Sequence, residues 1–160
     1  LRQHNNFLQI HREDRFARRY MAGVGHFDFG ENLKPIDFAG WLDDRRHSDP
    51  ESISFWLEYW VATYSFLLDL RVPDLQFLSY ERLCSDPEPT LLRISQVADI
   101  EARESLLSGS SRIQLAGPHR VSEEGFDREL LRRSQEIYES LQARSLQSIT
   151  TTLSGEIASP

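Results

Sequence analysis

The chain has 160 residues, of which 39% are hydrophobic and 27% are charged, the balance of an ordinary globular domain. Its formal net charge of −7 argues against a protein built to bind nucleic acid. No apolar run approaches the ~20 residues that a membrane span needs, and the polar start lacks the apolar segment of a signal peptide. A single cysteine, Cys84, excludes an internal disulfide, so we expect a cytoplasmic protein.

The beginning of the chain predicts two helices. Residues 1–10 fit the end of a helix, and residues 13–22 open on acids and close before two glycines. Three arginines of the second helix form either a solvated face or a surface that faces an anion. Leu1 is not an initiator methionine, so we expect the chain to start inside a longer or processed protein.

An aromatic loop at residues 25–30 (GHFDFG) comes next, followed by two more predicted helices. Residues 37–46 place three apolar side chains on one helical face. Residues 51–68 show the clearest helical periodicity of the chain and are rich in aromatic rings. These rings favour core packing, although one of them could instead stack on a nucleotide base.

Residues 72–99 decide the predicted fold class. Apolar and aromatic side chains at residues 75–80 predict a short, mostly buried strand. Residues 85–88 (SDPE) then predict a helix N-terminus with proline at the first helical position. A strand that leads into a helix within a few residues belongs to a layered α/β fold, so we expect a predominantly helical α/β chain with one short strand.

The last third of the chain predicts two helices separated by a long loop. Residues 101–107 form the first of these helices and residues 127–146 the second. Residues 110–125 contain several breakers and no sustained period, as functional loops often do. Residues 148–160 are small and polar and predict a tail, so we expect residues 1–147 to belong to a single domain.

Several of these segments resemble motifs of the sulfotransferase family. Residues 80–87 (YERLCSDP) are similar to the family's YEDL…DP segment, with an arginine in place of an acid. Residues 3–7 (QHNNF), 19–21 (RYM) and 25–30 (GHFDFG) resemble the bacterial branch of the family, with aspartate where glutamate is commoner in the loop. The resemblance implies the C-terminal part of a P-loop-like, three-layer α/β fold.

The same resemblance implies a cofactor and an activity. Sulfotransferases move a sulfuryl group from 3'-phosphoadenosine 5'-phosphosulfate (PAPS) to a hydroxyl or amine, without a metal. In relatives, basic residues of the loop before the last helix contact the 3'-phosphate, which implies Arg120 here, with Arg112 as second choice. A guanidinium suits this role because its planar fork matches a phosphate and its charge is permanent.

The resemblance implies that the reactive groups lie elsewhere. The loop that cradles the 5'-phosphosulfate and the general base are expected upstream of Leu1, so the catalytic residues are unknown. We therefore expect little or no transferase activity from this chain alone. Tyr80 and Glu81 are interpreted as structural, with the carboxylate accepting backbone N–H bonds.

Histidines are the remaining candidates for chemistry. His4 and His26 are either proton-transferring groups on the acceptor side or loop histidines bonded to the backbone. The spacing of His4, His11 and His26 fits no common metal site, so we expect no metal.

We thus expect a PAPS-dependent sulfotransferase whose acceptor is a small molecule, glycan or peptide. The alternative is a non-catalytic helical interaction module that keeps the family's scaffold, with residues 51–68 as its partner surface. Phosphoryl transfer is a weaker third possibility, because the sequence shows no Walker-type lysine and no metal-binding pair of acids.

Overall fold

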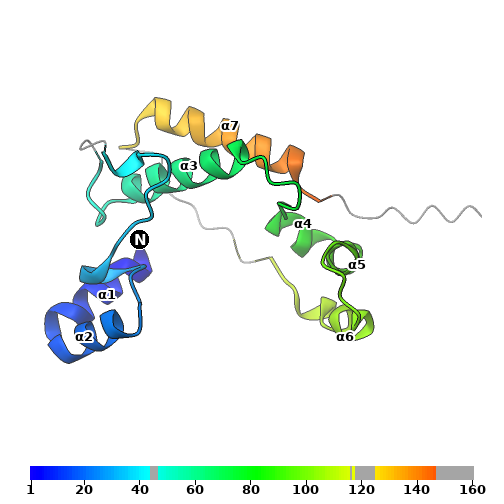
Figure 1. The fold of residues 1–160 in the computed structure, drawn as a ribbon, viewed down its shortest axis with the longest axis horizontal. Coiled ribbons are helices and arrows are strands. Elements are labelled where there is room, and N and C mark those ends of the chain that lie inside the picture. Colours follow the sequence, from blue (N-terminus) through cyan, green and yellow to red (C-terminus); the bar gives the residue numbers. More distant parts are fainter. Residues whose placement is uncertain (44–46, 116, 118–124, 147–160) are drawn as a thin grey trace, which may run out of the picture. The chain divides into compact units, whose positions relative to one another are not determined.

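The computed structural model describes residues 1–43, 47–115, 117 and 125–146. Within these ranges the chain is a series of α-helices and short 3-10 helices joined by loops (Figure 1). None of the described helices combines the length and the apolar character needed to cross a membrane.

The chain divides into two compact units. Unit 1 consists of Leu1–Arg71 and Glu123–Glu139, and unit 2 of Val72–Ser122 and Ser140–Pro160. Helix α7 (Arg128–Arg144) therefore contributes residues to both units. The expected tail at residues 148–160 lies outside the described residues, and the single domain expected over residues 1–147 stays a prediction.

Unit 1 begins with two helices that pack on each other and on a 3-10 turn (Figure 1). Their bounds are α1 (Arg2–Glu13), α2 (Arg15–Gly23) and η1 (Gly30–Asn32). Asp14 separates the two α-helices, because its backbone is extended and its carboxylate accepts the N–H groups of Phe16 and Ala17 at 2.8 and 3.1 Å. An N-cap of this kind starts a new helix and fixes a change of direction.

The helix predicted at residues 37–46 does not form at its start. Ala39 and Gly40 have φ values of 55° and 81°, which a right-handed helix cannot accommodate. The Asp37 carboxylate instead accepts the N–H of Leu42 at 2.9 Å. A single 3-10 turn, η2 (Trp41–Asp43), is what remains among the described residues.

Helix α3 (Ile53–Asp69) confirms the helix predicted at residues 51–68. Its N-cap is Ser52, whose hydroxyl accepts the N–H of Phe55 at 3.4 Å. Only Phe55 and Val61 of this apolar helix are fully buried, and most of its other side chains are partly exposed.

Unit 2 contains three short α-helices that pack in sequence, α5 against both α4 and α6. The bounds are α4 (Tyr80–Ser85), α5 (Pro87–Val97), α6 (Arg103–Ser108) and η3 (Ser110–Arg112). Helix α5 confirms the predicted start with Pro87 in its first turn. Thr90, Leu91 and Ser95 are its buried residues.

The predicted α/β fold is wrong for this chain as the structure describes it. No strand or sheet occurs among the described residues, so a P-loop-like layered fold with a strand at residues 75–80 is excluded for them. Phe77 forms one isolated parallel bridge with Ser145, in which the N–H of Leu146 donates to the Phe77 carbonyl at 2.9 Å.

Helix capping explains why no strand forms. A strand needs a neighbour that pairs along its length, and the described chain offers Phe77 a partner at one point only. Two residues later the Ser79 hydroxyl accepts the N–H of Arg82 at 3.2 Å and starts α4. The apolar residues read as a strand are thus a short extended lead into a helix.

Candidate functional site

Residues 3–7, 19–21 and 25–30 pack together in unit 1, where the loop after α2 packs on α1. His4 and His11 lie two turns apart on one face of α1 and are 3% and 1% exposed. The Nδ1 atom of His4 accepts the N–H of Gly30, and the Nδ1 atom of His11 accepts the N–H of Glu31, both at 3.2 Å. Two buried imidazoles therefore bind two successive backbone amides.

The hydrogen bonds assign the proton on each ring. Because Nδ1 accepts in both cases, the neutral rings carry their proton on Nε2. Nε2 of His11 lies 3.2 Å from the sulfur of Met21, which is a weak acceptor. Burial lowers the pKa of His4 below its ordinary value, and the neutral form is also the one that can accept from Gly30.

Gly30 is the residue that allows this close approach. Its φ is +72°, and a Cβ atom placed on it would lie 2.6 Å from His11 Nδ1 and 3.0 Å from Phe7 Cβ. Only glycine combines this backbone conformation with this contact.

His26 lies at the other side of Phe7. Their ring centroids are 4.8 Å apart, and Phe29 stacks on Phe7 at 6.1 Å. Nδ1 of His26 is buried and has no hydrogen-bond partner among the described residues. We call His4, His11, His26, Phe7 and Gly30 the histidine cluster.

Of the two histidines that the sequence suggested for chemistry, His4 and His26, the structure shows a hydrogen bond to the backbone for His4. His4 accepts the backbone N–H of Gly30, but it does so from helix α1 and not from a loop, whereas His26 packs against aromatic rings. A role of either residue on the acceptor side stays a prediction. Among the described residues, no three His, Cys, Asp or Glu side chains gather in a way that could hold a metal ion.

The structure describes one of the two predicted phosphate-binding arginines. Arg112 ends η3 in unit 2 and is exposed. Arg120, the preferred candidate, lies outside the described residues.

The YERL segment forms the start of α4 in unit 2. The Ser79 hydroxyl donates to Glu81 at 3.0 Å, and Gln142 of α7 reaches the same carboxylate at 3.4 Å. The pKa of Glu81 is lowered, first by a hydrogen bond from its own backbone N–H and then by the hydrogen bonds from Ser79 and Gln142. This arrangement matches the structural interpretation of Glu81 made from the sequence.

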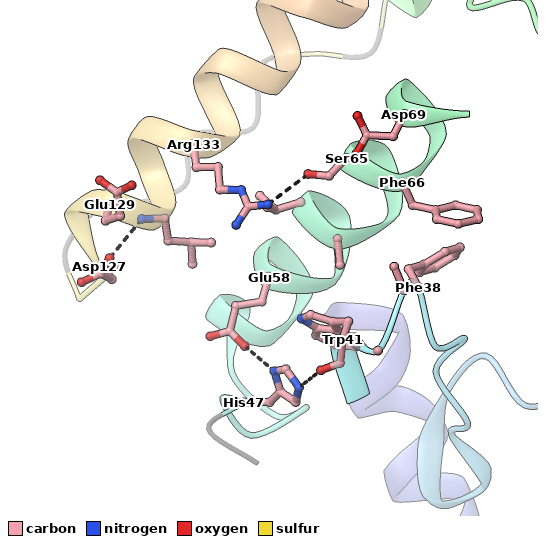
Figure 2. Close-up of a pocket in the computed structure, with 15 residues that line it drawn as sticks. Phe38, Trp41, His47, Glu58, Ser65, Phe66, Asp69, Asp127, Glu129 and Arg133 are labelled. Carbon is pink, nitrogen blue, oxygen red and sulfur yellow. Dashed lines mark hydrogen bonds and ion pairs between the residues drawn. The ribbon is translucent and has the colours of Figure 1, made fainter. Parts of the chain in front are cut away.

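A pocket of about 720 Å³ lies within unit 1, between α3, η2 and the first turns of α7 (Figure 2). Its larger apolar lining residues are Phe38, Trp41, Val61, Phe66 and Leu130. Its charged and titratable lining consists of His47, Glu58, Asp69, Asp127, Glu129 and Arg133.

One wall of the pocket is held by a small polar network. The hydroxyl and N–H of Ser48 donate to Glu58 at 2.7 and 3.1 Å. Nδ1 of His47 lies 3.7 Å from Glu58, and Nε2 of His47 donates to the Trp41 carbonyl at 2.5 Å (Figure 2). Ser48 and His47 therefore hold the Glu58 side chain in place on the pocket wall.

The sequence analysis considered His11 only as a metal ligand, and it did not indicate the pocket. The seven-residue spacing of His4 and His11, which puts both on one helical face, was the signal available for the former. The pocket joins residues of α3 to residues of α7 that are far away in the sequence, and no local pattern indicates such a contact.

Comparison with known proteins adds no relative. No known protein family, curated protein or solved structure matches the chain significantly.

Proposed function

We propose that the chain serves a PAPS-dependent sulfotransferase, an enzyme that transfers a sulfuryl group to a hydroxyl or amine of a small molecule, glycan or peptide. Its place would be the cytoplasm. The proposal concerns the activity and not the fold, because the described residues of this chain form helices.

The observation that carries the proposal is that the motif segments contact one another. The QHNNF segment supplies His4 and Phe7, which touch Gly30 and His26 of the GHFDFG loop. The carbonyl of Met21 in the RYM segment accepts the N–H of His26 in this loop at 2.9 Å. The three stretches that resemble the family thus pack together within unit 1, and this packing supports the proposal.

This chain would bind the cofactor through positively charged side chains. Arg120 and Arg112 are the proposed contacts to the 3'-phosphate. Arg112 is exposed and forms no ion pair with a described residue, so its donors are accessible to a phosphate.

Calorimetric titration with the desulfated cofactor, 3'-phosphoadenosine 5'-phosphate, tests the proposal. We expect at most weak binding by the 160-residue chain, because no strand-to-helix phosphate cradle occurs among its described residues. The complete product of the reading frame that encodes it should bind the nucleotide and transfer labelled sulfate from PAPS.

Two controls make the titration decisive. Arg120→Ala in the complete product should weaken nucleotide binding, whereas Arg71→Ala, a change to an exposed arginine outside the proposed loop, should not. Failure of the complete product to bind the nucleotide would contradict the proposal. Tight binding by the 160-residue chain would place the phosphate-binding groups inside it.

A second candidate is a non-catalytic interaction module that uses α3. The partial exposure of most apolar side chains on this helix favours it, since such a surface is stabilised when a partner covers it. A complete product that binds no nucleotide but captures a partner through α3 would favour this candidate.

A further inference from the structure

The pocket of unit 1 is lined by acidic and aromatic side chains that have no role in the proposed function. Its volume of about 720 Å³ falls within the usual range of small-molecule sites. Figure 2 shows side chains of α3, of α7 and of the segment around Trp41 lining it from several sides.

Carboxylates outnumber cations among the described lining residues. Glu58, Asp69, Asp127 and Glu129 face one guanidinium, that of Arg133, and the imidazole of His47. A bound anion would therefore meet net repulsion, whereas a bound cation would meet net attraction.

The carboxylates are not equally engaged. Asp127 caps α7 by accepting the N–H of Leu130 at 3.0 Å, and Glu129 forms an ion pair with Arg132. The Asp69 carboxylate forms no hydrogen bond or ion pair with a described residue. Its carboxylate is the group of the pocket that is available to a ligand.

Aromatic rings provide the other half of a recognition site. Phe38 packs on Phe66 with centroids 5.5 Å apart, and Trp41 lies beside them in the lining. Aromatic faces bury the apolar body of a ligand and also attract a cation through their quadrupole.

From these observations we propose that the pocket binds a small organic cation, an amine carried on an aromatic or aliphatic body. The ammonium group would lie toward Asp69, and the apolar body would lie against Phe38, Trp41 and Phe66. The inference concerns binding alone and is tested without nucleotide or sulfuryl transfer, so its failure and that of the proposed function are separate events.

A matched ligand series tests the proposal on the full chain. Phenethylamine, phenylethanol and phenylpropionate share a ring and differ in charge. Titration of nitrogen-15-labelled chain should give saturable shifts at the pocket residues with phenethylamine, weaker ones with phenylethanol and none with phenylpropionate. Equal or tighter binding of phenylpropionate, shifts scattered outside the pocket, or no binding of the amine would each overturn the proposal.

Two charge variants should change the amine affinity in opposite directions. Asp69→Asn removes a carboxylate from an exposed position and should weaken phenethylamine binding by about two- to five-fold. Arg133→Gln removes the opposing cation and should strengthen it by about two-fold. Asp74→Asn, an equal change of charge at an exposed residue outside the pocket, should leave it unchanged.

An aromatic variant separates ring contact from charge. Phe66→Leu keeps an apolar side chain but removes a ring from the lining, and it should weaken binding of both phenethylamine and phenylethanol. Phe16→Leu changes an exposed ring outside the pocket and should change neither. Circular dichroism checks that each variant is folded; unchanged affinity in a folded Asp69→Asn variant would refute the assignment of the ammonium group.

Discussion

Gly30 lies where the backbone of a loop packs directly against a buried imidazole. Its amide binds His4, its Cα faces His11, and its φ is +72°. The contact with His11 leaves no space for a Cβ atom, and the positive φ disfavours any residue that has one. The packing of the histidine cluster therefore requires a residue without a Cβ atom at position 30.

Gly30→Ala should therefore destabilise the chain. The new Cβ would overlap His11 Nδ1, and alanine would be held in the left-handed region, so we expect a loss of about 2–4 kcal/mol. Denaturant unfolding followed by circular dichroism measures it. Gly23→Ala is the matched control, since nothing lies within 4 Å of that position, and it should be neutral or slightly stabilising. Equal effects of the two substitutions would contradict the packing described here.

His4 should make the stability of unit 1 dependent on pH. The pKa of His4 is lowered from 6.5, mainly by burial, while nearby Glu51 and Asp49 act in the opposite direction. The unfolded chain then takes up this proton more readily than the folded chain. The contribution of His4 to the free energy of unfolding is complete above about pH 6.5 and is lost as the pH falls toward the lower folded pKa.

His4→Asn tests this dependence. Asparagine keeps an acceptor near the Gly30 amide but does not titrate. The drop in thermal midpoint between about pH 7.5 and about pH 5.5 should be smaller in the variant than in the parent chain. If the thermal midpoint fell equally in both chains, His4 would not be the cause of the pH dependence.

At the scale of the element, caps and left-handed residues decide where helices begin. Helices α3 and α5 could be predicted, because long periodicity marks the first and Asp86-Pro87 the second. The helix expected at residues 37–46 failed because Ala39 and Gly40 turn the chain, and nothing in the local pattern demands a positive φ at an alanine. The expected strand failed because its apolar residues lead into a helix capped by Ser79.

Ser79→Ala should weaken the start of α4. The substitution removes the acceptor for the Arg82 N–H and the donor to Glu81, so a loss of about 1 kcal/mol is expected. Thermal or denaturant unfolding gives the value. Ser85→Ala, at an exposed serine of the same helix, should change stability by less than about 0.5 kcal/mol. If both serines cost the same, Ser79 is not the cap.

At the scale of the whole molecule, the chain is two units whose candidate sites are built differently. The histidine cluster joins residues close in sequence, on helix α1 and in the loop that follows α2. The pocket joins α3 to α7 across a long stretch of chain, so the sequence could not indicate it. Prediction from sequence thus identified several helices, but not the contacts between side chains or between distant segments.

One face of α2 should make the molecule associate with itself. Phe16 stacks on Tyr20, and Phe16 is 75% exposed. Exposed apolar patches of this kind favour contacts between molecules. The average mass from light scattering should rise with concentration for the parent chain and rise less for Phe16→Ser. Arg15→Gln changes the charge next to this patch but not its apolar area, and should behave as the parent does.

The backbone bond between Leu146 and Phe77 also bears on the order of events during synthesis. A ribosome makes Phe77 long before it makes Leu146, so the carbonyl that this bond engages must wait for its donor. Closing so wide a loop is slow compared with forming a helix. The segment that leads into α4 therefore lacks this hydrogen bond until Leu146 has been synthesised. A stop codon placed just before Leu146 would release a chain whose second unit cannot form the bond.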